Sequence, residues 1–170
     1  MMINNNWYIN ADKGSIDFNA EKSKKAVEDG KFGEEMTAKI LEGHGIRILR
    51  DLNAEGNHFR GGDFIINYGG KDYLLEVKTN AGKVGNRVYD TWFLEVATSS
   101  GHTSHTLTDM QTDIVAAYNM STGKVHLFNA RKLREVVKSK RTVRGASNCP
   151  GILVGWEEKE AGHIITLENK

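Results

Sequence analysis

Hydrophobic residues in this chain form short runs separated by polar or glycine-rich segments, a pattern typical of a domain that combines helices and strands. The clearest runs flank Gly69-Gly70, within residues 61–80, and are rich in isoleucine, phenylalanine, tyrosine, leucine and valine. A pair of glycines readily adopts the positive φ angles that a two-residue type I′ turn requires. The pattern therefore predicts a β-hairpin with Gly69-Gly70 as its loop.

The predicted hairpin determines which polar side chains meet. Counting outward from the turn pairs Ile65 with Leu74. The same count pairs Asp63 with Glu76, and residues that pair directly lie on the same face. Lys78 follows Glu76 by two positions, so the alternation of a strand returns it to that face. We therefore expect Asp63, Glu76 and Lys78 to converge.

Asp63 and Glu76 would form a pair of carboxylates on one face of a sheet. Such a pair is repulsive, and in a partly buried site the pKa of one member rises unless the two share a cation. Carboxylate oxygens suit Mg²⁺ or Mn²⁺ better than zinc. The arrangement predicts a site for a divalent metal ion.

The remaining elements are predicted from hydrophobic periodicity and turn residues. Residues 91–99 are almost continuously apolar, so this predicted strand is expected inside the sheet. A helix is predicted over residues 110–120, with Ile114, Val115 and Tyr118 facing the core. The other predicted elements are helices at 20–30, 33–42 and 130–140 and strands at 46–50, 124–129, 151–155 and 164–167.

The helix predicted at residues 33–42 begins with two adjacent glutamates. Glu34 shares a helical spacing with Ala38 and Leu41, on the side that faces the sheet. Glu35 lies on another side and is expected in solvent. Glu34 is therefore the candidate for a role in the site, and the alternative is that it also faces solvent.

Gly62-Asp63 followed by Glu76-Val77-Lys78 resembles the motif of the PD-(D/E)XK nuclease superfamily, which includes restriction enzymes, Holliday-junction resolvases and phage recombination nucleases. Gly62 stands where that family usually has proline. The predicted order of helix, strand, hairpin, strand, helix and strand is similar to the core of the family. The resemblance implies an α/β fold with a restriction-endonuclease-like core, in which helices flank a mixed central sheet.

The resemblance also implies a role for each residue of the motif. Asp63 and Glu76 would hold a Mg²⁺ or Mn²⁺ ion together with the carbonyl oxygen of Val77. Glu34 would reach the ion directly or through water, and Lys78 would orient the attacking water and stabilise negative charge. These roles imply a metal-dependent DNA endonuclease that hydrolyses phosphodiester bonds, with structure selectivity like that of the resolvases. A non-catalytic module that binds DNA or protein, and an RNA nuclease, are the alternatives.

Two further residues are candidates for accessory roles. Glu95 interrupts an apolar run, and a carboxylate in a buried strand is rarely unpaired. It is expected to be an accessory metal ligand or a partner of Lys78, and a structural ion pair is the alternative. Gln111, on the first turn of the helix predicted at 110–120, is expected to face nucleic acid or to order His102.

Basic residues are concentrated in segments that are suited to phosphate groups. Between Arg131 and Arg144 there are seven basic residues and one acidic residue, and this excess fits a phosphate backbone; a solvated helix face is the alternative. The candidate nucleic-acid-binding residues are Arg60, Lys83, Arg87, His102, His105, Lys138 and Arg141. For Lys83 and Arg87 the alternative is an ordinary surface connection, and for His102 and His105 it is exposure to solvent. The two histidines of this set lack a cysteine partner, so zinc binding is not expected there.

The chain has 170 residues, of which 39% are hydrophobic and 26% charged, and these values favour one globular domain. We assign residues 1–29 to an N-terminal extension and residues 30–170 to the nuclease-like domain. The formal net charge of +1 does not by itself indicate a nucleic-acid-binding protein. The prediction of DNA as the partner therefore depends on how the charges are distributed.

Cys149 is the single cysteine of the chain, which fits a reducing compartment. No apolar run approaches the roughly 20 residues that a membrane-spanning helix needs. We therefore expect a cytoplasmic protein without membrane contact, located in the host cytoplasm if a phage encodes it. A homodimer is compatible with the resemblance, because resolvases and many restriction enzymes cut two strands as homodimers.

Overall fold

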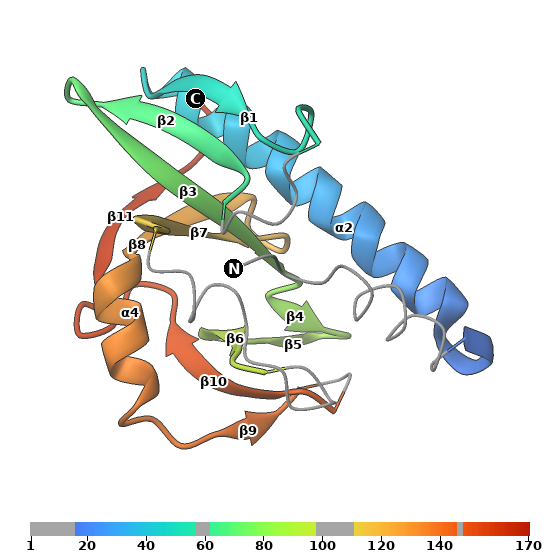
Figure 1. The fold of residues 1–170 in the computed structure, drawn as a ribbon. Coiled ribbons are helices and arrows are strands. Elements are labelled where there is room, and N and C mark those ends of the chain that lie inside the picture. The colour runs from blue at the N-terminus through green and yellow to red at the C-terminus, as the bar shows by residue number, and fades with distance from the viewer. Residues whose placement is uncertain (1–15, 57–61, 98–110, 146–147) are drawn as a thin grey trace.

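The computed structural model describes residues 16–56, 62–97, 111–145 and 148–170, with side chains from residue 24 onward within these ranges. The fold is α/β (Figure 1). In chain order the elements are α2 (Ile16–Gly43), β1 (Arg47–Asp51), β2 (Phe64–Tyr68), β3 (Lys71–Asn80), β4 (Lys83–Val84), β5 (Arg87–Val88), β6 (Thr91–Glu95), β7 (Ile114–Asn119), β8 (Lys124–Asn129), α4 (Ala130–Val137), β9 (Val143–Arg144), β10 (Pro150–Gly155) and β11 (His163–Leu167).

A six-stranded sheet in the order β1-β2-β3-β7-β8-β11 forms the centre of the protein. Neighbouring strands in it are antiparallel except for β3 and β7, which are parallel. The predicted α/β class with a mixed central sheet is therefore confirmed. A three-stranded sheet, β6-β10-β9, and the short β4–β5 pair complete the described part of the fold.

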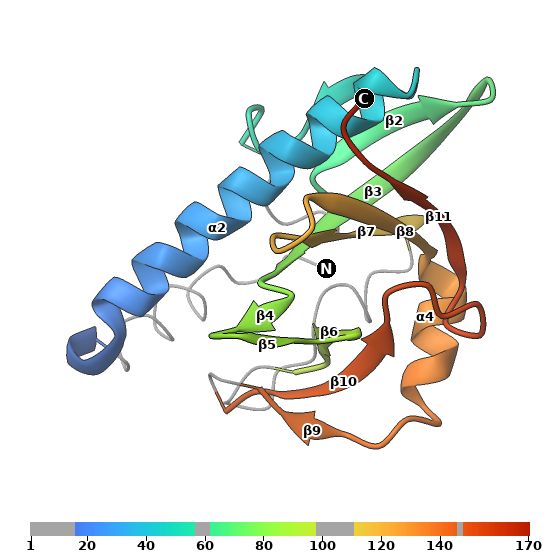
Figure 2. The ribbon, with the colours of Figure 1, turned by 180° about the vertical axis from the view of Figure 1, so that it is seen from behind.

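Different elements cover the two faces of the central sheet (Figure 2). Helix α2 packs on one face, where Ile40 and Leu41 join the hydrophobic core around Leu75. Helix α4 and strands β6 and β10 contribute to a second core on the other face, which contains Trp92 and Leu133. Because side chains alternate along a strand, the inner strands β7 and β8 contribute to both cores.

The hairpin of β2 and β3 is confirmed. Gly69 and Gly70 have φ angles of 60° and 79°, in the region that a type I′ turn requires. Ile65 pairs with Leu74, as the count outward from the turn predicts. Five other predicted elements are also found, with small shifts of their ends. They are the strands at 46–50, 124–129, 151–155 and 164–167 and the helix at 130–140.

The helix predicted at residues 110–120 is wrong, because Ile114–Asn119 form strand β7. All residues of β7 are buried, and the strand lies between β3 and β8. A short, continuous apolar run fits a buried strand as well as a buried helix, and its length favours a strand. Ile114 and Tyr118 belong to the first core and Val115 to the second, so they do not form one stripe.

Strand β6 lies within the predicted strand at 91–99, but the expectation that it is inside the central sheet is wrong. It is an edge strand of the three-stranded sheet, where it pairs with β10. A side-chain contact joins it to the central sheet, since the Phe93 N–H donates to Asn80 Oδ1 at 3.0 Å. Its pairing partner is distant in sequence, so local periodicity could not assign its sheet.

The helices predicted at 20–30 and 33–42 are one continuous helix, α2. Gly30 and Gly33 lie inside it. A Cβ atom at Gly33 would overlap the side chain of Thr79, so glycine at this position lets the helix approach β3. The helix also continues across residue 29, where the N-terminal extension was expected to end; the division into extension and domain stays a prediction.

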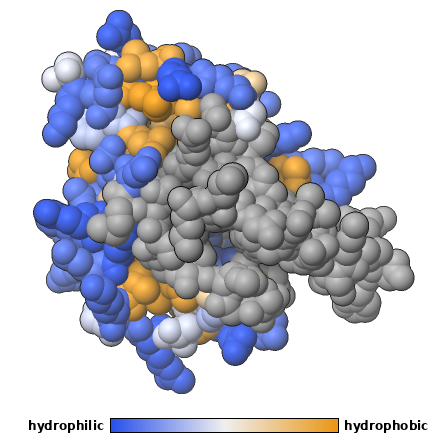
Figure 3. Space-filling view, viewed as in Figure 1, coloured by the Kyte–Doolittle hydropathy of each residue, from blue (hydrophilic) through white to orange (hydrophobic). Residues whose placement is uncertain are grey.

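The described surface is mostly hydrophilic in the view of Figure 3, with hydrophobic residues gathered in separate patches. Among the described residues, no helix has both the length and the apolar character that crossing a membrane requires.

Candidate active site

Asn53 joins two of the carboxylates that the sequence singles out. Its Nδ2 donates to Glu34 Oε2 and to Asp63 Oδ1, each at 2.9 Å. Glu34 comes from α2, Asn53 from the turn after β1, and Asp63 from the residue before β2. The hydrogen bonds therefore hold three separate segments together at one end of the hairpin.

The side chain of Asp63 accepts a hydrogen bond from the backbone of β3 that a neighbouring strand would otherwise accept. Strand β2 begins at Phe64, and the Val77 N–H donates to Asp63 Oδ2 at 2.7 Å. The backbone of Asp63 is also fixed, because its N–H donates to the Leu75 carbonyl at 2.8 Å and its carbonyl accepts from the Leu52 N–H at 2.9 Å. Hydrogen bonds thus hold both the main chain and the side chain of Asp63.

Glu76 and Lys78 form an ion pair on β3, with 2.5 Å between Lys78 Nζ and Glu76 Oε1. The Glu76 side chain is 12% exposed and that of Lys78 is 34% exposed. The two residues are two positions apart, so they share one face of the strand. The charge of Lys78 therefore offsets that of a largely buried carboxylate.

Both carboxyl groups that contact Asn53 have raised pKa values. Burial, followed by repulsion from Asp63, raises the pKa of Glu34 to about 7. Burial is also the main cause of the raised pKa of Asp63; repulsion from Glu76 adds to it. Hydrogen bonds from Val77 and Asn53 act in the opposite direction on Asp63. These donors thus offset only part of the cost of placing the two negative charges here.

Lys78 is held in its charged form. Burial by itself lowers the pKa of its amine, but Glu76 raises it, with further contributions from Asp63 and Glu95. The net pKa is above the usual value of a lysine. Lys78 is therefore a cation and a hydrogen-bond donor at neutral pH.

Glu95 faces this cluster from β6. Burial raises its pKa, while the charge of Lys78 and a hydrogen bond with Cys149 lower it. Cys149 precedes β10, the strand that pairs with β6. The structure thus brings Glu95 into the electrostatic environment of Lys78, from a different sheet than the one expected.

The carboxylates do not all meet at one point. Among the described histidine, cysteine, aspartate and glutamate residues, the one group whose ligand atoms all lie within 4.8 Å of one another is in another part of the sheet. Asn53 lies between Glu34 and Asp63, and Lys78 lies beside Glu76. A hydrogen-bond donor thus lies beside each of the three carboxylates.

Gln111 does not lie on the first turn of a helix, because the following residues form β7. Its expected placement was derived from the incorrect helix at 110–120, so that placement is wrong. His102, the residue that Gln111 was expected to order, lies outside the described residues.

The predicted nucleic-acid-binding residues lie in several places. Lys83 and Arg87 are exposed on the β4–β5 pair, which directly follows β3, and Arg87 lies over the ring of Tyr89 at 5.2 Å. Lys138 and Arg141 are exposed just after α4. Arg60, His102 and His105 lie outside the described residues.

Two hollows differ in their relation to these residues. A hollow of about 370 Å³ is lined by Glu34, Lys31, Asp51 and Phe64 among others, so Glu34 is accessible from solvent. A larger groove of about 880 Å³ is lined by apolar side chains of the sheet and by Arg131 and Arg134. Within the described part of the chain, the larger groove includes none of the predicted site residues.

Sequence reasoning missed Asn53 and a group formed by His126, Glu157 and His163. Asn53 lies in a polar loop, and its sequence offers no sign that it contacts Glu34. For His126, the alternation of β8 was a usable signal, because this residue falls on the same side as the buried Phe128.

Comparisons with protein-family models, with curated proteins and with solved structures found no match to this chain. The functional argument therefore depends on the residues and the geometry of the site.

Proposed function

We propose that this protein is a metal-dependent DNA endonuclease with a restriction-endonuclease-like core. The observation that carries the proposal is the position of Asp63 beside β3, where Val77 donates to its carboxylate and Glu76 and Lys78 follow on the same strand. Glu34 reaches this place from α2 through Asn53. Two carboxylates and a lysine in this arrangement match the motif that the sequence resembles.

The donor set fits a hard divalent cation. Glu34, Asp63 and Glu76 offer carboxylate oxygens. The N–H and the carbonyl of a strand residue lie on the same side, so the Val77 carbonyl lies on the side of Asp63. The raised pKa values of Glu34 and Asp63 reflect negative charge that the protein compensates only in part. Mg²⁺ or Mn²⁺ is the class of ion that these oxygens favour.

When bound, such an ion polarises the phosphate and lowers the pKa of a bound water. Asp63 and Glu76 would hold the ion with the Val77 carbonyl, and Glu34 would complete the set directly or through water. Lys78 is protonated, so it acts as a donor that orients water and stabilises developing negative charge, and it does not act as a base. The negative charge of Glu95, on β6 of the three-stranded sheet, also favours the charged form of Lys78.

DNA is the proposed substrate, as the resemblance implies, and Lys83 and Arg87 lie on the β4–β5 pair that directly follows β3. These exposed cations suit a phosphate backbone that passes the site. Cleavage of both strands of a duplex or a junction would need two such sites, which a homodimer provides. The cytoplasm, of a host cell if a phage encodes the protein, is the compartment proposed for this activity.

A substrate panel tests the proposal. The full chain is incubated with linear, circular, forked and four-way DNA and with single-stranded RNA, in Mg²⁺, in Mn²⁺ and in EDTA. We expect metal-dependent cleavage of at least one DNA and none in EDTA. Cleavage of RNA alone would favour the RNA nuclease, and intact substrates throughout would favour the non-catalytic binding module.

A further inference from the structure

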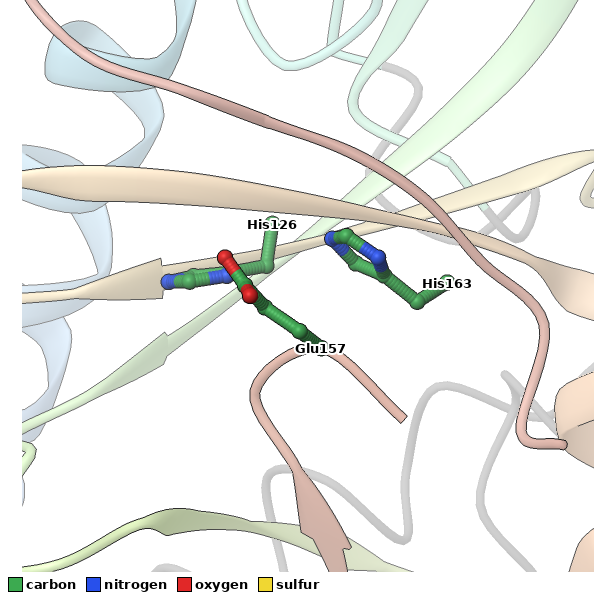
Figure 4. Close-up of side chains that lie close together, drawn as sticks. All are labelled: His126, Glu157 and His163. Atoms are coloured by element: carbon green, nitrogen blue, oxygen red, sulfur yellow. The ribbon is translucent and has the colours of Figure 1, made fainter. Parts of the chain in front are cut away.

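Two histidines and a glutamate gather on the central sheet, outside the proposed nuclease site (Figure 4). His126 is on β8, His163 begins β11, and Glu157 lies in the turn between β10 and β11. One ligand atom from each lies within 4.8 Å of those of the other two. Two imidazoles and a carboxylate form a donor set that is typical of Zn²⁺ and related transition-metal ions.

An irregularity in β11 brings the two imidazoles together. His163 pairs with Phe128 and Thr166 pairs with His126, and the register shifts between His163 and Ile165. In a regular strand, residues three positions apart face opposite sides of the sheet. The shift places His163 on the side of Thr166 and His126, as a β-bulge does when it redirects a side chain.

The Thr166 hydroxyl lies at the centre of the group. It is 3.0 Å from His126 Nδ1 and 3.0 Å from His163 Nε2. It donates to Glu157 Oε1 at 2.9 Å. A hydroxyl carries a single proton, so after this donation the two ring nitrogens must supply any further protons themselves.

Each of the two rings also has a hydrogen bond with the main chain. His126 has a hydrogen bond with the backbone of Trp156, and His163 has one with the backbone of Ile165. Each bond raises the pKa of its ring, which means that the ring is the donor. A neutral imidazole has one N–H, so a ring that gives this proton to the main chain has a lone pair on its other nitrogen.

Both rings are in the neutral form that binds metals. Burial lowers the pKa of His126 to about 4, and burial also lowers the pKa of His163. A metal-binding histidine commonly donates its other ring N–H to a backbone carbonyl, and this bond fixes the orientation of the ring. His126 and His163 each have a hydrogen bond with the main chain.

The two imidazoles and the carboxylate thus gather around one hydroxyl, and a cation would accept a lone pair from each of these three side chains. We propose that His126, His163 and Glu157 form a binding site for a divalent transition-metal ion of the zinc class. The ion would join β8, the turn after β10 and the C-terminal strand β11. Glu157 is exposed, which leaves a route from solvent to the site.

This site is separate from the carboxylate site on β3. Lys78, Ala117, His126 and Thr166 follow one another across β3, β7, β8 and β11. Adjacent strands are about 4.8 Å apart, so His126 lies about 10 Å from Lys78 across the sheet. The two sites also differ in chemistry, because one offers nitrogen ligands and the other only oxygen. Each can therefore be tested without the other.

The test is a calorimetric titration of EDTA-treated, dialysed full-length protein with ZnCl₂, followed by thermal denaturation. We expect one equivalent to bind with high affinity at the histidine site and the melting temperature to rise. The His163→Gln and Glu157→Gln variants should bind at least about 10–100-fold more weakly, since loss of a ligand costs no less than loss of an outer partner. Co²⁺ in place of Zn²⁺ should give a visible absorption band that the same variants lack.

Two matched variants complete the design. His44→Gln removes an imidazole whose Nε2 lies 2.8 Å from the Glu168 carbonyl, away from the group, and should leave Zn²⁺ binding unchanged. Asp63→Asn changes the nuclease site and should also leave it unchanged. The proposal is overturned by the absence of Zn²⁺ binding, by equal binding in His163→Gln and Glu157→Gln, or by loss of binding in Asp63→Asn. None of these results decides whether the protein cuts DNA.

Discussion

At the scale of single residues, Asn53 is the hydrogen-bond donor that joins two carboxylates of the acidic site. Its side-chain amide donates hydrogen bonds to Glu34 and to Asp63, each at 2.9 Å, and the Val77 N–H also donates to Asp63. The pKa values of Glu34 and Asp63 are nevertheless raised. The folded protein therefore carries unfavourable negative charge at this place, and a divalent cation would relieve it.

Replacement of Asn53 by alanine should leave two half-buried carboxylates without their shared donor. We expect the free energy of unfolding to fall by about 1–3 kcal/mol, the usual cost of an unsatisfied buried polar group. We also expect about 10–100-fold weaker Mn²⁺ binding, because Asn53 orients two ligands. Asn67→Ala, which removes an exposed amide bonded to Asp72, is the control. Equal effects of the two variants in denaturant and metal titrations would contradict the role of Asn53.

Glu34 should make the stability of the metal-free protein depend on pH. Its pKa is 4.5 for an ordinary glutamate and about 7 in the folded protein, so between these pH values the folded state binds more protons than the unfolded state. The free energy of unfolding therefore falls as the pH rises through this range. The penalty is fully present above pH 7 and absent below pH 4.5.

The Glu34→Gln variant removes that penalty. After allowance for solvent screening we expect a gain of about 1 kcal/mol at pH 8, which corresponds to about 2–4 °C in melting temperature. The gain should vanish near pH 4.5. Glu35→Gln, a change at the exposed neighbour, should show neither effect. A Glu34→Gln variant that melts at the wild-type temperature at pH 8 would show that Glu34 is not destabilised by burial.

At the scale of elements, the site exists because β2 begins late and α2 comes close to β3. The first residue of β2 is Phe64, so Asp63 is available to accept from Val77. Gly33 lies against Thr79 and lets α2 pack closely beside the strand. The position of Glu34, the next residue on the helix, depends on this close approach.

Gly33→Ala should therefore damage both stability and the site. The added Cβ atom would overlap Thr79, so the helix must move, and such overpacking costs about 1–3 kcal/mol. Gly30→Ala on the same helix has nothing within 4 Å of its Cβ atom and should stabilise the protein by about 0.5–1 kcal/mol. Opposite signs in urea denaturation are the expected result. A stabilising Gly33→Ala would contradict the close packing of α2 on β3.

The hairpin was predictable from sequence because its signals are local. The turn requires glycine and the strands alternate, so Asp63, Glu76 and Lys78 could be placed in one region. Strand β7 was mistaken for a helix because residues 114–118 are apolar throughout, and burial on both faces removes the alternation that identifies a strand. The sheet to which β6 belongs is set by β10, a distant segment, and no local pattern reports that pairing.

The site was predictable only in part for the same reason. The motif gives the acidic residues and the lysine, and a carboxylate within an apolar run marked Glu95 as a candidate, but Asn53 reaches the site only through tertiary packing. The irregularity that turns His163 toward His126 is a property of strand pairing and leaves no clear mark in the sequence.

At the scale of the whole molecule, the proposed active site lies where elements from both faces of the central sheet meet. Glu34 comes from α2, which covers one face, and Glu95 comes from β6, which belongs to the sheet on the other face. Asp63 and Lys78 lie between them on the hairpin. Cleavage should therefore be sensitive to changes in either layer, whereas the His126 group is two strands away.

The most direct measurement of the central claim compares DNA cleavage rates of Asp63→Asn and Asp72→Asn in saturating Mn²⁺. Both changes replace one hairpin carboxylate by an amide, but Asp72 is exposed near the turn and outside the site. We predict that Asp63→Asn loses about 100-fold or more of the rate, with its fold retained by circular dichroism, and that Asp72→Asn keeps the wild-type rate. Equal cleavage by both variants would contradict the assignment of Asp63, and with it the proposed nuclease site.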